Sequence, residues 1–199
     1  MISLGIFAKP PLPGSVKTRL IPDIGAVKAA SVYRYCLEYT LEVAQRSGLD
    51  YRLYLSEVSD DALFQDEEHS VQRGHDLGTR MFNAFKDLLS TGTDGALIIG
   101  SDCLDITARH LQQAAEALAD HELVLLPAVD GGYALIGCAR INPELFSHVR
   151  WSSDDVLEQT ISNAENLDYR VSLLETVRDI DTLQDLEQYP ELLALIASS

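Results

Sequence analysis

The most informative part of the sequence is the stretch ISLGIFAKPPLPGSVKTRL, residues 2–20. Residues 2–8 form an apolar run of the length of one buried strand, and the loop that follows holds three prolines, one glycine and three basic residues. In open α/β sheets, ligands bind outside the carboxyl ends of the strands. The stretch therefore predicts an α/β domain with a ligand-binding loop directly after its first strand.

Elsewhere in the chain, apolar runs typical of buried strands alternate with segments of helical periodicity. We expect strands at residues 51–56, 96–100, 123–128 and 133–138, and helices at residues 26–46, 76–89, from Asp105 or Thr107 onward, 152–163 and 182–197. Gly48 stands at the C-cap of the first of these helices, and Ser152 and Asp155 stand as a capping pair at the fourth. This alternation predicts a single domain over residues 1–199, with a mostly parallel central sheet flanked by helices on both faces.

The net charge of the chain indicates which classes of binding partner are disfavoured. Acidic residues outnumber basic ones by 31 to 15, which gives a formal net charge of −16. A field of this sign disfavours nucleic acids and anionic membranes, whereas a local cluster of bases can still hold an anionic small molecule. Residues 57–68 carry six acids and no base, and we interpret them as a solvated, partly mobile loop.

The ends and the cysteines indicate the compartment. The amino-terminal segment has no basic leader, and no apolar stretch approaches the ~20 residues that span a bilayer. The three cysteines are widely spaced, which indicates neither a disulfide framework nor a zinc site. We therefore expect a cytoplasmic protein without a membrane span.

The loop after the first strand has the composition of a phosphate-binding loop. Its prolines stiffen the chain and Gly14 lets the backbone approach a ligand, so that Lys9, Lys17 and Arg19 can surround a diphosphate. The loop is not a Walker motif, because Val16 stands where that motif requires glycine. The alternative is an exposed loop whose bases merely offset the acidic surface.

The segment LIIGSDCLD, residues 97–105, is the next candidate. Asp102 follows an apolar strand, where a carboxylate is a natural ligand for a hard divalent cation such as Mg²⁺, which needs only one or two carboxylates when phosphates supply the other oxygens. The alternative is that Asp102 caps the following helix. We interpret Asp105 as a cap rather than a ligand.

The string VDGGY, residues 129–133, is the third candidate. Taken alone it predicts a turn between two strands, because glycine accepts a positive φ. In the functional interpretation, Gly131 and Gly132 admit a substrate close to the backbone, and Asp130 acts as a base or a second metal ligand.

Six stretches together resemble a family of bacterial glycosyltransferase-like proteins. They are FAKPPLPGSVKTRL, GHDLGTRM, LIIGSDCLD, PAVDGGYALIG, WSSDDVL and DIDTLQDL, and they run in order from Phe7 to Leu186. The resemblance implies a Rossmann-like GT-A fold of the nucleotide-diphospho-sugar transferases. It extends to the 2-phospho-lactate and molybdenum-cofactor guanylyltransferases, which transfer a nucleotidyl group.

The resemblance also implies roles for individual residues. The residues implied around the nucleotide phosphates are Lys9, Gly14, Lys17 and Arg19. Those implied at the base and ribose are Gln72, Asp76 and Gly78. Asp102 would bind Mg²⁺ or Mn²⁺, and Asp181 would make a second metal contact. The residues implied on the acceptor side are Asp130, Gly131, Gly132 and Tyr133.

These roles predict a metal-dependent transferase that takes a nucleotide or nucleotide-sugar donor and a small-molecule acceptor, and within that class a glycosyltransferase that acts from a nucleotide-diphospho-sugar. Lys17 and Arg19 would neutralise charge on the departing group, and Asp130 would take the proton of the acceptor hydroxyl. Three alternatives stay open: nucleotidyl transfer with release of pyrophosphate, a non-catalytic nucleotide-binding protein, and a phosphatase. The sequence does not specify the base or the sugar of the donor, the acceptor, or the oligomeric state.

Overall fold

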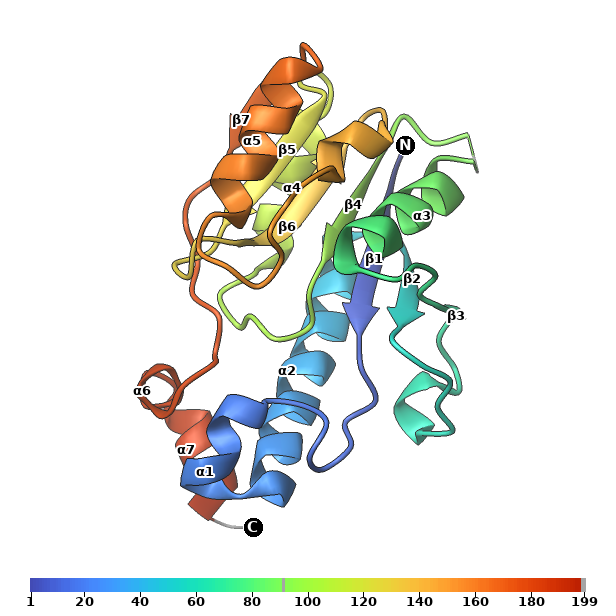
Figure 1. The fold of residues 1–199 in the computed structure, drawn as a ribbon. Coiled ribbons are helices and arrows are strands. Elements are labelled where there is room, and N and C mark those ends of the chain that lie inside the picture. The colour runs from blue at the N-terminus through green and yellow to red at the C-terminus, as the bar shows by residue number, and fades with distance from the viewer. Residues whose placement is uncertain (91, 198–199) are drawn as a thin grey trace.

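The computed structural model describes residues 1–90 and 92–197, and within them one seven-stranded sheet forms the centre of the molecule (Figure 1). The strands are β1 (Ile2–Ala8), β2 (Asp50–Leu55), β3 (His69–Val71), β4 (Gly95–Ile99), β5 (Leu123–Pro127), β6 (Tyr133–Cys138) and β7 (Val171–Leu173). Their order is β3-β2-β1-β4-β6-β5-β7, and β6 alone among these runs antiparallel to its neighbours. The predicted mostly parallel α/β sheet is confirmed.

Helices cover both faces of this sheet, as the sequence predicts. The α-helices are α1 (Ile21–Ile24), α2 (Ala26–Ser47), α3 (Leu77–Leu89), α4 (Ala108–Ala117), α5 (Val156–Asn166), α6 (Leu183–Leu186) and α7 (Pro190–Ala197). The 3₁₀ turns are η1 (Thr18–Leu20), η2 (Ala62–Phe64) and η3 (Pro143–Phe146). Apolar side chains of α2 and α4 pack on one face, and those of α3, η3 and α5 pack on the other. Among the described helices, none combines the length and the apolar character that crossing a membrane requires.

A third apolar cluster lies beyond the carboxyl ends of β1 and β4. Leu20, Val32 and Leu192 meet there. As a result, α1 from the start of the chain and α7 from its end lie side by side at the N-terminal end of α2 (Figure 1). Ile180 also belongs to this cluster. Because Ile180 is buried there, the segment that precedes α6 crosses the end of the sheet.

Two predicted helices differ from the structure. The helix expected from residue 152 begins at Val156, because Ser152 has a φ of 63° and the Asp155 side chain makes no capping hydrogen bond. The predicted capping pair is therefore wrong. The closing helix expected over residues 182–197 is divided into α6 and α7, since Pro190 has no N–H to donate within a continuous helix.

Short edge elements were not foreseen. β3 and β7 have three residues each, too few for a clear alternation of apolar and polar side chains. The acidic loop at residues 57–68 is not solvated throughout, because it contains η2, buries Phe64, and holds Asp61 in an ion pair with Arg34. Thr107, one of the two expected caps of α4, does cap it.

Candidate functional site

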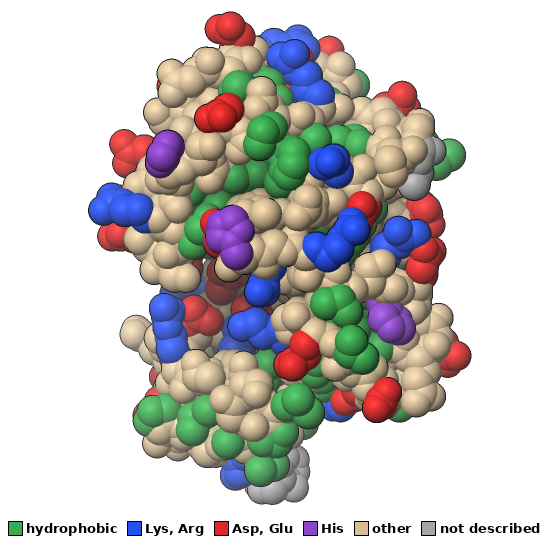
Figure 2. Space-filling view, turned by 45° about the vertical axis from the view of Figure 1, so that its right-hand side comes forward, with side chains coloured by type: hydrophobic (Ala, Val, Ile, Leu, Met, Phe, Trp, Pro, Cys, Tyr) green, Lys and Arg blue, Asp and Glu red, His purple; other side chains and the backbone are tan. Residues whose placement is uncertain are grey.

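A cleft of about 440 Å³ lies at the carboxyl ends of β1, β2 and β4. Figure 2 shows the hollow, with Lys and Arg side chains gathered around it and acidic side chains inside. The residues that line it are Phe7, Ala8, Lys9, Val16, Lys17, Thr18, Arg19, Tyr33, Ser56, Gln72, Leu77, Arg80, Gly100, Ser101, Asp102 and Asp181. The three bases of the opening loop, Asp102 and Asp181 therefore share one cleft, as the sequence predicts.

Lys17 is the centre of the charged groups in this cleft. Its Nζ donates to Asp102 Oδ2 at 3.1 Å and to Asp181 Oδ1 at 3.3 Å, and Arg19 donates to Asp181 Oδ2 at 2.8 Å. The Lys17 side chain is only 3% exposed, whereas Arg19 is 67% exposed. Burial alone would lower the pKa of Lys17, but the charges of Asp102 and Asp181 outweigh it and raise that pKa. The two carboxylates thus favour the charged form of Lys17.

The backbone of Lys17 is held in the left-handed region, with φ 45° and ψ 44°. For a residue with a side chain this conformation costs about 1–2 kcal/mol, so the surroundings must stabilise it. Leu20 N–H donates to Lys17 O, which starts η1, and Leu20 is buried in the third apolar cluster. The turn therefore aims the ammonium into the cleft.

Tyr33 on α2 joins the two loops that carry the charged groups. Its hydroxyl accepts from the Lys9 backbone N–H at 2.8 Å and lies 2.7 Å from Ser101 Oγ. Burial raises the pKa of Tyr33 to about 12, so the hydroxyl stays protonated. Because Ser101 precedes Asp102, this contact ties the loop after β1 to the metal-ligand candidate after β4. Nothing in the sequence singles out Tyr33, whose position in α2 is also that of a core residue.

Asp179 is a second residue that sequence reasoning missed. Its Oδ1 is buried without a hydrogen-bond partner among the described residues. Burial, followed by the charges of Asp102 and Asp130, raises the pKa of Asp179 to about 7. Asp179 and Asp181 are two residues apart in the string DIDT, a spacing that in an extended segment puts both side chains on one side of the chain. That spacing was the available signal.

The residues assigned to the base and ribose do not lie together. Gln72 lines the cleft, and its Nε2 donates to Tyr54 O at 2.8 Å. Asp76 is instead the N-cap of α3, where the Thr79 backbone N–H lowers the pKa of its carboxyl. Gly78 is buried, and a Cβ at this position would lie 2.7 Å from the Trp151 ring. Asp76 and Gly78 thus start and pack α3.

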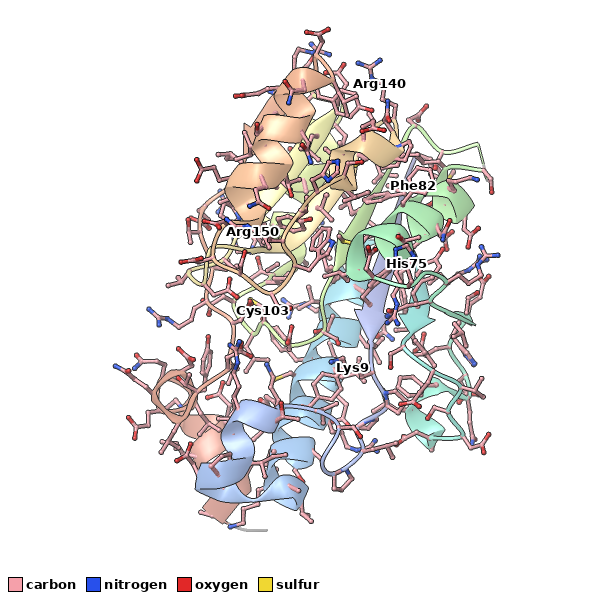
Figure 3. The ribbon with its side chains drawn as sticks, viewed as in Figure 1. Lys9, His75, Phe82, Cys103, Arg140 and Arg150 are labelled. Atoms are coloured by element: carbon pink, nitrogen blue, oxygen red, sulfur yellow. The ribbon has the colours of Figure 1, made fainter. Side chains whose placement is uncertain are left out.

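Arg80, from the same GHDLGTRM stretch, faces the cleft in their place. Its Nε donates to Gly74 O at 3.1 Å, and its Nη1 donates to Gln72 Oε1 at 3.4 Å. Figure 3 shows the neighbouring His75 beside the start of α3, and Lys9 beyond the end of β1. Gly14, the other assigned loop residue, is exposed, has a φ of 88°, and is not among the residues that line the cleft.

The acceptor-side turn lies next to this cluster rather than in the cleft wall. Asp130 is exposed, and its Oδ1 accepts from the Gly132 N–H at 3.0 Å. Its charge contributes to the raised pKa of Asp179. The hydroxyl of Tyr133 is buried in the apolar layer beneath α5. The turn therefore exposes Asp130 but buries the Tyr133 hydroxyl.

We expect Gly131→Ala to destabilise the protein by about 3 kcal/mol, because it combines overpacking with a strained φ. The φ of Gly131 is 86°, and an added Cβ would lie 2.1 Å from Asp154 O. Gly48→Ala is the matched control: its φ is 75° with nothing within 4 Å, so only the strain of about 1–2 kcal/mol remains. Urea unfolding measures both, and equal losses would contradict the steric argument.

The acidic residues fit a metal that is held jointly with a ligand. Within residues 1–90 and 92–197, no three His, Cys, Asp or Glu side chains form a group that could hold a metal by themselves. Asp102 and Asp181 are 43% and 34% exposed, so each can offer oxygen to a cation in the cleft. Mg²⁺ accepts such a pair when waters and phosphates complete its coordination.

The fold is that of the nucleotide-sugar transferases, and the comparisons with known proteins give the family. The sequence model of a family described as uncharacterized protein conserved in bacteria (DUF2064) matches residues 40–153. The chain belongs to this family. The search of curated proteins found no match.

Three solved structures define the relationship. A crystal structure from Desulfovibrio desulfuricans G20, provisionally assigned as a nucleotide-diphospho-sugar transferase, has 30% identity and a TM-score of 0.91 over 99% of this chain and 97% of its own. CMP:2-keto-3-deoxy-manno-octonic acid synthetase complexed with CTP has 13% identity and a TM-score of 0.58 over 97% and 98%. Rv0371c from Mycobacterium tuberculosis H37Rv, in complex with manganese, has 16% identity and a TM-score of 0.51 over 96% and 98%. The last two show a shared fold alone.

Proposed function

We propose that this protein is a metal-dependent transferase that uses a nucleotide-diphospho-sugar as donor and acts as a glycosyltransferase, with residues 1–199 forming one GT-A-type domain. The observation that carries the proposal is the meeting of Lys17, Arg19, Asp102 and Asp181 in one cleft at the carboxyl ends of β1 and β4. Such a set of alternating charges suits a diphosphate bound together with a cation. The 30% identity to the Desulfovibrio protein supports the donor class.

Each side chain has a definite task in this proposal. Lys17 and Arg19 bind the phosphates and stabilise the negative charge that develops on the departing nucleoside diphosphate. Asp102 and Asp181 hold Mg²⁺ or Mn²⁺, and the bound ion supplies further neutralisation of the phosphate oxygens. Gln72 and Arg80, which also line the cleft, contact the nucleoside. The proposal leaves Asp76 and Gly78 to the start of α3.

The acceptor approaches from the side of Asp130 and Asp179. Its hydroxyl oxygen attacks the anomeric carbon, the bond from that carbon to the β-phosphate oxygen breaks, and the hydroxyl proton passes to a carboxylate. Asp130 is the base in this proposal, because it is exposed beside the cluster.

The experiment is a thermal-shift panel of nucleotides and nucleotide sugars, each with and without Mn²⁺. A ligand that binds only the folded state stabilises it by about 2.7 kcal/mol at 100 times its Kd. For a chain of this length that corresponds to a rise in Tm of about 5–10 °C. Because the ion and the phosphates bind jointly, we expect the rise to depend on Mn²⁺. A panel without any rise would contradict nucleotide binding and with it the transferase proposal.

Nucleotidyl transfer is the second candidate, since the CTP-bound synthetase has the same fold. The products separate the two reactions. Glycosyl transfer releases a nucleoside diphosphate, whereas attack on the α-phosphorus releases pyrophosphate. Phosphate release without an acceptor would instead indicate a hydrolase, and a ligand that binds without any turnover would indicate a regulatory nucleotide-binding protein.

A further inference from the structure

The ammonium of Lys17 already occupies the place of a cation between Asp102 and Asp181. It lies 3.1 Å from an oxygen of the first and 3.3 Å from an oxygen of the second. Mg²⁺ binds carboxylate oxygens at about 2.0–2.1 Å, so an ion on Asp102 Oδ2 would lie at most about 5 Å from Lys17 Nζ. At that distance two cations repel each other strongly and compete for the same oxygen lone pairs.

Lys17 is also held there more firmly than an ordinary surface lysine. Its side chain is almost fully buried, it contacts two carboxylates at once, and its left-handed backbone is locked by the start of η1. Arg19 differs on each point, since it is 67% exposed and pairs with Asp181 alone. Water and salt screen an exposed pair of that kind, whereas they screen a buried one much less. Lys17 therefore disfavours the binding of a metal ion to these carboxylates more strongly than Arg19 does.

We propose that Lys17 closes the Asp102–Asp181 pair to a divalent cation in the free protein, and that a phosphate-bearing ligand opens the pair by drawing the Lys17 ammonium toward its own oxygens. Lys17 lines the cleft, and a lysine has a flexible stem and three donors with which to change partners. Binding is then ordered, with the nucleotide before the metal. The second half of this inference rests on the proposed function, whereas the first half concerns the free protein alone.

The test of the first half uses Mn²⁺ alone, with free Mn²⁺ measured by electron paramagnetic resonance and no nucleotide present. We expect Lys17→Met to lower the Kd for Mn²⁺ at least about tenfold, because it removes a unit charge near the ion. Adding Asp102→Asn to Lys17→Met should cancel that gain. Both carboxylates are partly exposed, so water can solvate them in Lys17→Met, and circular dichroism verifies the fold.

Two further variants keep the test decisive. Asp102→Asn in the otherwise unchanged chain should change the Kd for Mn²⁺ by no more than about twofold from that of the unaltered protein, because a pair that Lys17 occupies contributes nothing to metal binding. This measurement does not require a Lys17 variant to fold. Arg19→Met is the matched control and should tighten Mn²⁺ binding much less than Lys17→Met, because solvent screens its charge. The inference is overturned if the unaltered protein binds Mn²⁺ as tightly as Lys17→Met, if Asp102→Asn alone weakens binding tenfold, or if Arg19→Met reproduces the effect of Lys17→Met.

The second half needs the nucleotide that the thermal-shift panel identifies. In its presence, Asp102→Asn should weaken Mn²⁺ binding at least about tenfold, in contrast to its lack of effect in the free protein. An equal, small effect of Asp102→Asn with and without the nucleotide would overturn the ordered opening. If no nucleotide binds, the proposed function fails, but the measurements with Mn²⁺ alone still decide whether Lys17 closes the pair.

Discussion

Replacing Asp102 by alanine should lower kcat/KM for the identified donor by about 10²–10³, which corresponds to the 2.7–4 kcal/mol lost with one preorganised charge-stabilising group. The variant loses a candidate metal ligand and one of the two carboxylates that position the Lys17 ammonium. We also expect the Mn²⁺-dependent part of the nucleotide thermal shift to disappear.

Asp60→Ala is the matched control for this variant. Asp60 is an exposed acid in the loop after β2, so its removal changes the net charge equally and leaves the cleft intact. Circular dichroism establishes that both variants fold. Turnover of Asp102→Ala at the level of Asp60→Ala, with an unchanged Mn²⁺ dependence, would remove Asp102 from the site.

Asp179→Asn should stabilise the protein against unfolding by up to about 4 kcal/mol above pH 7. Burial and two neighbouring carboxylates raise the pKa of Asp179 from 3.8 in the unfolded chain to about 7 in the folded one. Between these values the folded protein holds a proton that the unfolded chain has lost. The contribution of Asp179 to stability therefore falls as the pH rises from about 4 to about 7, and it stays low at higher pH.

The measurement is urea unfolding at pH 4, 6 and 8 in buffer with EDTA, which keeps adventitious metal out of the acidic cluster. The stabilisation by Asp179→Asn should be near zero at pH 4 and should grow with pH, because asparagine does not ionise. Asp60→Asn, at an exposed position, should show no such growth. An Asp179→Asn variant that is no more stable than the unaltered protein at pH 8 would contradict the raised pKa.

Much of the fold was accessible from local patterns. The bounds of β1 and β6 were predicted to the residue, because each is a short apolar run that ends at a turn or loop. The αL cap at Gly48 and the cap at Thr107 were also correct, since capping depends on a few adjacent residues. β3 and β7 were missed because the sheet, and not their own pattern, makes them strands: β2 pairs with β3, and β5 pairs with β7.

The residues predicted for the candidate site also fall into two groups, those that line the cleft and those that the structure places elsewhere. Lys17, Arg19 and Asp102 were identifiable because each follows a buried strand, and the ends of parallel strands meet at one edge of a sheet. Asp76 and Gly78 come from a stretch of the same kind, yet the first caps α3 and the second packs against Trp151. A motif thus locates a segment near the site, but it does not say which of its side chains faces the ligand.

Local sequence was enough to predict the strands β1, β2, β4, β5 and β6, the helices α2 to α5 and the charged loops after β1 and β4, because strand and helix periodicities and caps depend on neighbours within a few residues. The contacts of Lys17 with carboxylates 85 and 164 residues away arise from the packing of the folded chain and have no local signal in the sequence. Those contacts exist because β1 pairs with β4, and because burial of Ile180 draws the last segment across the end of the sheet. The raised pKa of Asp179 has the same origin, since burial and the approach of distant charges are properties of the packed chain.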